Sequence, residues 1–351
     1  GMLAPAGMYL AVAGAPATRS GWGVPMATDI AFAVGILTLL GKRVPAALRV
    51  LLLALAVIDD LGAIVVIALF YSEGVAFGGL LLAGAGFLGI LVMQRLGVRT
   101  KLAYVAPALV AWAGVYAAGI HPTIAGVLVG LMTPVRAWLG SEGFLTGMKD
   151  QLDRLGKGAP DALSPHELAE ALRHVDDARR EALSPAEALI ERLHPWVAFG
   201  IMPVFALANA GVVLAGGSLN GASWSVLSGV ILGLVVGKPV GVLLASALTL
   251  RLGVATLPAG MRYRHLVVLG AVAGVGFTMS LFVAQLAFTD PALLAAAKLG
   301  VLGASVAAAV LALALGRTLL SPVAPGAAAG AGAASFGAAE SADEAESETA
   351  S

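Results

Sequence analysis

Residues 46–70 read AALRVLLLALAVIDDLGAIVVIALF, and this stretch decides the fold class. It is apolar from end to end, apart from Arg49 near its start and the adjacent Asp59 and Asp60 near its middle. A helix of about 20 apolar residues is long enough to cross a bilayer. A barrel strand needs only about 10 residues, so the stretch is too long for one. It therefore predicts a transmembrane helix that carries two acidic residues at mid-membrane depth.

The whole chain has the composition of a membrane protein. Of its 351 residues, 59% are hydrophobic and only 12% are charged, whereas soluble proteins carry about 25% charged residues. The formal net charge of +0 does not favour a nucleic-acid partner. The sequence contains no Cys, which excludes disulfides, thiol catalysis and thiolate metal sites. We therefore expect an all-α polytopic membrane protein that is surrounded by lipid.

Apolar segments recur along the chain, and Gly, Pro and charged residues mark their boundaries. The first segment, 1–15, is short for a span and has no basic leader, so we expect it to be the second half of a helix that begins upstream. With the segments that follow it, the sequence predicts about ten transmembrane segments, the first one partial. The later segments are 24–40, 45–71, 76–96, 102–119, 122–135, 196–215, 224–249, 265–288 and 292–319.

The basic residues predict the orientation of these segments. Most of the 21 Lys and Arg residues fall in alternate loops and in the long connection 136–195, whereas the loops at 72–75, 120–122, 216–223 and 289–291 contain none. Cytoplasmic loops carry an excess of Lys and Arg. We therefore expect the 136–195 connection and the C-terminus to be cytoplasmic.

Two parts of the chain differ in character from the membrane domain, which we place at 1–320. The 136–195 connection contains the capping boxes Ser164–Glu167 and Ser184–Glu187, which predict short helices at about 165–181 and 185–193. We interpret it as a solvated connector rather than a regulatory loop. Residues 321–351 are rich in Ala, Gly, Ser and Glu, which predicts a disordered acidic tail.

Charged residues are rare within the predicted spans. The acidic ones are Asp29, Asp59 and Asp60, and Lys238 is the basic residue at a helix centre. Each such charge costs about 2.5–3.5 kcal/mol at mid-membrane. A structural ion pair stabilises less well than apolar packing, and three acids face one base. We therefore favour a role in transport over a structural one.

The geometry of a helix separates the two neighbouring aspartates. Consecutive residues project about 100° apart, so Asp59 and Asp60 cannot point at the same spot. One carboxylate can face an aqueous path while the other faces a neighbouring helix, where Lys238 is the mid-membrane cation. A carboxylate that holds either a proton or a small hard cation, but never both, is sufficient for exchange.

Two segments have the pattern of interrupted helices. One reads GWGVPMATD over 21–29, and the other contains Gly270, Gly274 and Gly276 followed by Phe-Thr-Met-Ser. Gly in membrane helices also serves close packing, which remains an alternative for Gly270 and Gly274. An interruption would free backbone carbonyls and helix termini near the midplane. We expect two discontinuous helices, with Asp29 and Lys238 compensating the charges of their termini.

Several motifs resemble those of the bacterial NhaA Na⁺/H⁺ antiporters. The resemblance covers nearly all of 1–320 in order, and its Asp-Asp and Gly-Lys-Pro contexts are specific. It implies an inverted-repeat antiporter fold of twelve helices that this chain enters midway through the third. The motifs are GWGVPMATDIAFA (21–33), AVIDDLGAI (56–64), HPWV (194–197), FALANAG (205–211), VGKPVG (236–241) and GVGFTMSLF (274–282).

The resemblance also implies roles for individual residues. Asp60 would be the principal cation ligand, and Asp59 would be its partner at the Na⁺ site and would pair with Lys238 in one state. Thr28 and Asp29 would also take part in cation and proton binding. They match an unwound stretch that crosses the second broken helix at Gly274 and Gly276, where the backbone is discontinuous.

The implied activity is electrogenic, pH-dependent exchange of Na⁺ or Li⁺ for H⁺ in sodium and pH homeostasis. It requires no cofactor, involves no catalytic residue, and takes place in a homodimer in the full-length family members.

Two other functions remain as alternatives. A solute/cation symporter of another family would also bury carboxylates in its helices. An intramembrane aspartyl protease places aspartates on two helices, as Asp29 and Asp59 or Asp60 would be, but it uses a Gly-x-Gly-Asp sequence that does not occur here. A mid-membrane Lys238 would also be unexplained in a protease, so we expect a transporter rather than an enzyme.

Overall fold

The computed structural model describes residues 1–71, 76–98, 101–135, 137, 143, 145–149, 173, 184–211, 221–258 and 260–321. Within these ranges all regular structure is helical and no β-strand occurs, which confirms the predicted all-α class. The chain divides into two compact units. Unit 1 comprises Gly1–Tyr71 and Val204–Ser351, and unit 2 comprises Ser72–Pro203.

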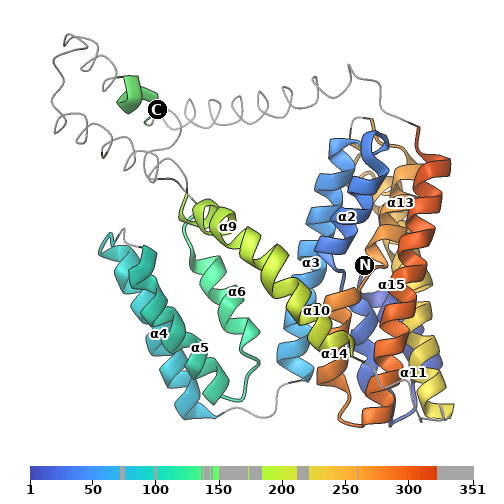
Figure 1. Ribbon diagram of the computed structural model, residues 1–351, viewed down its shortest axis with the longest axis horizontal. Coiled ribbons are helices and arrows are strands. Elements are labelled where there is room, and N and C mark those ends of the chain that lie inside the picture. Colours follow the sequence, from blue (N-terminus) through green and yellow to red (C-terminus); the bar gives the residue numbers. More distant parts are fainter. Residues whose placement is uncertain are drawn as a thin grey trace. The chain divides into compact units, whose positions relative to one another are not determined.

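Long apolar helices form the frame of unit 1 (Figure 1). Three of them have 25, 31 and 29 residues with mean hydropathies of 2.6, 2.1 and 2.2, so each is long and apolar enough to cross a bilayer. The second of them widens for one turn into a π-helix immediately before Lys238. These elements are α3 (Ala46–Phe70), α11 (Gly221–Leu232), the π-helical η6 (Gly233–Gly237), α12 (Lys238–Arg251) and α15 (Pro291–Leu319).

Two further segments of unit 1 each consist of two helices that meet at a sharp bend, in stretches that contain Gly and Pro or several Gly residues. In the first, the 3₁₀-helix η1 (Arg19–Met26) and α2 (Ile30–Leu40) meet at a bend of 41°. In the second, α13 (Tyr263–Ala273) and α14 (Phe277–Ala287) meet at a bend of 46°. The short elements α1 (Leu3–Ala13), η2 (Gly41–Arg43) and α10 (Met202–Ala210) complete the described part of unit 1.

The apolar core of unit 1 consists of two clusters, and α15 contributes to both. Its first half, including Val301, packs in a cluster with α1, α11 and α14, while its second half, including Ala312, packs in a cluster with α2, α3 and α13. Ser305 lies between the two halves, and its Oγ accepts a hydrogen bond from the backbone N–H of Phe277 at 3.2 Å. The core therefore has a polar middle layer at the level of the second break.

Unit 2 is built on a tight pair of helices, α4 and α5. A Cβ added at Gly86 would lie 2.3 Å from the backbone N of Ala111, and one at Gly114 would lie 2.2 Å from that of Ala83. Such small residues let two membrane helices approach backbone to backbone. The described elements are α4 (Phe77–Arg95), η3 (Lys101–Tyr104), α5 (Val105–Ala117), α6 (Thr123–Met132), α9 (Pro185–Trp196) and the π-helical η5 (Val197–Ile201).

Five described helices are long and apolar enough to cross a membrane, or up to seven if each bent pair counts as one span. The helices Leu3–Ala13, Leu102–Ala117 and Thr123–Met132 are apolar but shorter. The expected helix at 165–181 and the tail at 321–351 lie outside the described residues, except for Arg173 and Ser321.

The structure corrects one predicted boundary. The sequence predicted a short helix at 185–193 that is separate from a span at 196–215, but one continuous helix runs from Pro185 to Ala210. Its start confirms the second capping box, because Ser184 and Glu187 bond each other's backbone N–H groups. Pro195 lies inside the helix and is followed by the π-helical turn η5. Pro195 therefore does not end the helix, although it has no N–H to donate to the preceding turn.

Candidate functional site

The two broken segments of unit 1 contact each other directly at their interruptions. The backbone N–H of Asp29 donates to the carbonyl of Val275 at 2.8 Å, so one interruption binds the other. Thr28 Oγ1 donates to the carbonyl of Ala273, the last residue of α13, at 3.1 Å. Helix ends leave backbone groups without intrahelical partners, and here each interruption supplies partners for the other.

Asp29 caps two of the resulting helix N-termini. Its Oδ1 accepts from the backbone N–H of Phe32 at 3.1 Å and thereby caps α2. Its Oδ2 accepts from the backbone N–H of Thr278 at 3.0 Å and from Thr278 Oγ1 at 2.5 Å, in the first turn of α14. Asp29 is only 1% exposed. A buried carboxylate with three donors interacts favourably with the positive ends of both helix dipoles.

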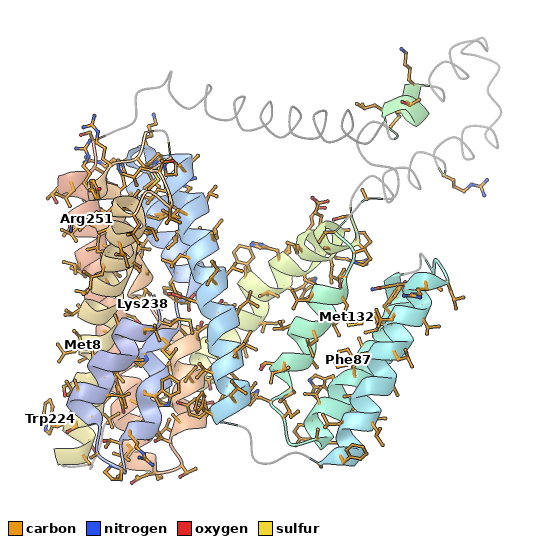
Figure 2. All side chains as sticks on the ribbon, turned by 180° about the vertical axis from the view of Figure 1, so that it is seen from behind. Met8, Phe87, Met132, Trp224, Lys238 and Arg251 are labelled. Atoms are coloured by element: carbon orange, nitrogen blue, oxygen red, sulfur yellow. The ribbon has the colours of Figure 1, made fainter. Side chains whose placement is uncertain are left out.

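Lys238 forms a buried ion pair with Asp59. Its Nζ lies 2.9 Å from Asp59 Oδ2 and also donates to the carbonyl of Met26, at the end of η1. Lys238 is 0% and Asp59 2% exposed. Figure 2 shows Lys238 about midway between Trp224 and Arg251, which mark the two ends of the α11–α12 helix. The cation therefore neutralises one carboxylate and one helix C-terminus deep in unit 1.

Thr28 connects this ion pair to the crossing. Its Oγ1 lies 3.3 Å from Asp59 Oδ2, as well as 3.1 Å from the carbonyl of Ala273. A hydroxyl has one hydrogen to donate, so it can bond only one of the two acceptors at a time. Thr28 is 0% exposed.

Asp60 has different surroundings from Asp59. It is half-buried on α3, and its Oδ1 is shielded from solvent without a hydrogen-bond partner among the described residues. A buried carboxylate oxygen without a donor is costly unless a proton or a cation occupies it. Among the described residues no three His, Cys, Asp or Glu side chains gather around a potential metal position. Asp60 thus differs from Asp29 and Asp59 in having a shielded oxygen without a hydrogen-bond partner among the described residues.

The glycines of the second interruption are required by close approach. A Cβ at Gly274 would lie 2.6 Å from the carbonyl oxygen of Leu234, and one at Gly276 would lie 2.2 Å from Ser280 Oγ. Gly274 ends α13 and Gly276 begins α14. Both interruptions can therefore pack against η6, the turn that immediately precedes Lys238.

Sequence reasoning named Asp29, Asp59, Asp60, Thr28 and Lys238. The structure brings Thr28, Asp59 and Lys238 into one bonded group. Asp29, next to Thr28 in the chain, bonds Phe32 and Thr278 instead, and Asp60 follows Asp59 on α3. Sequence reasoning missed Thr278 and the carbonyls of Met26 and Ala273. The one signal for Thr278 was its place directly after the Gly-Val-Gly interruption, since hydroxyl residues often bond near helix starts. The carbonyls have no sequence signal, because every residue carries one.

Comparison with known sequences identifies the family of the chain. Residues 1–315 match the family described as Na⁺/H⁺ antiporter 1. The chain is 65% identical to the Na⁺/H⁺ antiporter NhaA 2 of Myxococcus xanthus over 351 residues, which are 100% of this chain and 72% of that protein.

Two further relatives show the same extent of similarity. The NhaA 2 antiporter of Sorangium cellulosum is 52% identical over 99% of this chain and 73% of its own length. The NhaA 2 antiporter of Pseudomonas putida KT2440 is 49% identical over 90% of this chain and 70% of its own length. The family match covers most of the chain, and each of these relatives is aligned over more than two thirds of its length. The chain belongs to the Na⁺/H⁺ antiporter 1 family.

Proposed function

We propose that the protein exchanges Na⁺ for H⁺ across a membrane and that both ions compete for Asp60. The exchange itself follows from membership of the family and from the relatives' activity as named. The observation that assigns it to Asp60 is the shielded Oδ1 without a partner, next to a pair whose charges already neutralise each other. Carboxylate oxygens suit small hard cations, and the same oxygen can take a proton instead.

Asp59 and Lys238 act as the partner pair of this site. Their ion pair is buried, so its two charges stabilise each other only while both are present. When Na⁺ binds at Asp60 with the help of Asp59, Lys238 loses its partner and can release a proton. Thr28 can then turn its hydroxyl from Asp59 to the carbonyl of Ala273 and leave Asp59 free to contact the ion. The cycle thus exchanges more than one proton for each Na⁺ and is electrogenic.

Asp29 acts mainly as a fixed negative charge. Both of its oxygens already accept hydrogen bonds from helix N-termini, so it has less capacity than Asp60 for a transported ion. Gly274 and Gly276 keep the interruption narrow enough for this contact. Asp29 and Lys238 together compensate the termini of two discontinuous transmembrane helices.

We extend the proposal to the localisation, fold and partners of the whole chain. We place it in a bacterial inner membrane as an inverted-repeat fold with about ten transmembrane segments, and 1–320 as its membrane domain. The 136–195 connection and the tail 321–351 would be cytoplasmic. The protein would contact lipid, form a homodimer and need no cofactor beyond the transported Na⁺ or Li⁺ and H⁺.

Everted membrane vesicles test the exchange. Respiration acidifies their interior, and a fluorescent weak base reports the resulting pH difference. Added Na⁺ or Li⁺, but not K⁺, should collapse it, because cation entry releases protons. Asp60→Asn should retain less than about one tenth of this response, since an amide cannot exchange a proton for a cation.

The alternatives predict other results in the same vesicles. A symporter would need a second solute for the Na⁺ effect, and a protease would cleave membrane peptides without affecting the pH difference. Full activity of Asp60→Asn would remove Asp60 as the exchange site.

A further inference from the structure

Helix α10 buries a polar residue instead of an apolar one. Of its nine residues, Met202 to Ala210, Asn209 alone is buried, with 8% of its surface exposed. Leu207 on the same helix is 79% exposed. Most helices attach to a protein through an apolar stripe. The apolar contacts of α10 in unit 1 include only the partly buried Ala210 against the core cluster and the ring of Phe205 against that of Phe282, so its buried amide stands out.

One hydrogen bond between side-chain amides joins α10 to α14, and a second links the same Asn209 to a carbonyl of its own helix. Gln285 Nε2 on α14 donates to Asn209 Oδ1, and Asn209 Nδ2 donates in turn to the carbonyl of Phe205 at 2.7 Å. The Phe205 ring contacts the Phe282 ring of α14, with their centroids 6.2 Å apart. Lys298 of α15 adds a weak contact to the carbonyl of Gly211 at 3.4 Å.

The register of α14 relates these contacts to the ion site. Thr278, Phe282 and Gln285 are spaced four and three residues apart, so they share one face of the helix. Thr278 bonds Asp29 in the crossing, and Phe282 and Gln285 follow it in that order toward the C-terminal end of α14. The seam between α10 and α14 therefore leads from the ion site toward the end of unit 1 at which α11 begins (Figure 1).

We propose that Asn209 and Gln285 form a latch, defined by the Gln285–Asn209–Phe205 hydrogen-bond chain, that closes the path from the ion site to this end of unit 1. The latch opens once in each transport cycle, when α10 separates from α14. This inference depends on the proposed exchange function. Asn209 and Gln285 are positioning residues, because neither contacts the ion.

The strength of the latch suits a contact that must open repeatedly. One intramolecular hydrogen bond shifts an equilibrium by only about two- to tenfold. Gln285 is exposed in this structure, so its side chain is not held in place by packing around it. Separating a helix that is attached by a buried apolar stripe would cost more free energy, since exposing apolar surface to water is unfavourable.

A chemical cross-link tests whether the latch must open. The sequence contains no Cys, so Asn209→Cys with Gln285→Cys in the full-length protein places a thiol pair at the latch. A short bifunctional thiol reagent that can be cleaved by reduction should bridge the pair and remove at least nine tenths of Na⁺/H⁺ exchange. Cleaving the bridge should restore exchange. Each single Cys variant, treated in the same way, should keep its activity.

The cross-linking experiment distinguishes failure of the latch from failure of the proposed exchange function. Full exchange by the bridged protein would overturn the latch, and failure of the reagent to bridge the thiols would contradict the contact itself. Absence of exchange in the untreated wild-type protein would instead overturn the proposed function, so the two failures are distinguishable.

Removing the hydrogen bond gives a second, independent measurement. Gln285→Leu should favour the state that is open at the α11 end. The KM for Na⁺ offered at that end should fall, and the KM for Na⁺ offered at the Arg251 end should rise, with the ratio of the two changing about two- to tenfold. Right-side-out and everted vesicles present the two ends separately.

The matched control exchanges the two side chains. Asn209→Gln combined with Gln285→Asn retains both amides and their combined length, and should restore the wild-type KM ratio. A role in stability alone would lower activity equally from both sides. Equal KM changes on the two sides in Gln285→Leu, or no change, would therefore contradict the latch.

Discussion

Asp59 and Asp60 are adjacent in the sequence but have different partners. Asp59 faces Lys238 and Thr28, whereas Asp60 keeps an oxygen without a hydrogen bond among the described residues. Their separation of about 100° around α3 accounts for the difference. One residue step on a helix thus places a neutralised acid beside an acid that is available to an ion.

Competition at Asp60 gives a testable pH dependence. When Na⁺ and H⁺ exclude each other from one carboxylate, acidification raises the apparent KM for Na⁺ but leaves the maximal rate reachable at high Na⁺. We expect the KM to rise up to about tenfold per pH unit on the acid side, as for one competing proton. Rates over a range of Na⁺ concentrations at several pH values measure this. A maximal rate that falls with pH while the KM stays constant would contradict direct competition.

Thr278 supplies two donors to Asp29, and only one of them is its side chain. Thr278→Val keeps the shape of the side chain but removes its hydroxyl and therefore its hydrogen bond to Asp29. A hydrogen bond to a charged group contributes about 1.5–3 kcal/mol. We expect roughly tenfold slower exchange and a lower unfolding temperature in detergent. Thr278→Ser, which keeps the hydroxyl, is the control and should remain close to wild type. Equal exchange rates and unfolding temperatures of Thr278→Val and Thr278→Ser would show that the hydroxyl makes no contribution.

Sequence reasoning found the charged residues of this site for a physical reason. Charges are expensive in a membrane helix, so Asp29, Asp59, Asp60 and Lys238 stand out in apolar surroundings. Thr278 costs little there and does not stand out. The carbonyls of Met26 and Ala273 accept hydrogen bonds from Lys238 and Thr28. Gly and Pro in the sequence indicated where the helices would be interrupted, but not which carbonyls would accept these bonds.

At the scale of elements, Gly and Pro have different structural outcomes at different places in the chain. Pro25 and Gly276 lie within or next to the two observed breaks. Pro195 belongs to the same residue class, yet the helix continues past it into the π-helical turn η5. The outcome depends on whether the backbone can form a wider turn, and local sequence does not reveal this.

The helix pair α4–α5 offers a test at the same scale. A Cβ at Gly86 would meet the backbone of Ala111 at 2.3 Å, whereas Gly84, two residues earlier, has nothing within 4 Å. Gly86→Ala should destabilise the protein by about 1–3 kcal/mol because the helices must move apart. Gly84→Ala is the matched control and should not destabilise it. Thermal unfolding in detergent measures both, and equal stability of the two variants would contradict the close approach.

At the scale of the whole molecule, each buried charge of the site is balanced by an opposite charge or a helix end next to it. Lys238 balances Asp59 and the end of η1, while Asp29 balances two helix starts. Exchange of one Na⁺ for one H⁺ at Asp60 alone would move no net charge. The electrogenic cycle proposed above needs a second group that changes its protonation, and we propose that the buried pair of Asp59 and Lys238 provides it.

Neutralising this pair should separate exchange from its response to voltage. Asp59→Asn with Lys238→Gln keeps a hydrogen bond between the two side chains but removes both charges. Moving one uncompensated charge across 100 mV is worth about 2.3 kcal/mol, so the wild-type rate should change strongly with an imposed potential. We expect the double variant to exchange Na⁺ for H⁺ at a rate independent of the potential. Proteoliposomes with and without a K⁺ gradient and valinomycin provide the measurement.

The control for this prediction removes a lysine elsewhere. Lys42→Gln deletes an exposed cation on η2 and should leave the voltage response intact, because water screens that charge throughout the cycle. If the Asp59→Asn and Lys238→Gln double variant kept the full voltage response, the second proton would have to travel elsewhere. Asp29 would then be the next candidate, since it is the remaining buried acid of the crossing among the described residues. Its three hydrogen bonds would have to break in each cycle, and Thr278→Val would then speed up exchange instead of slowing it.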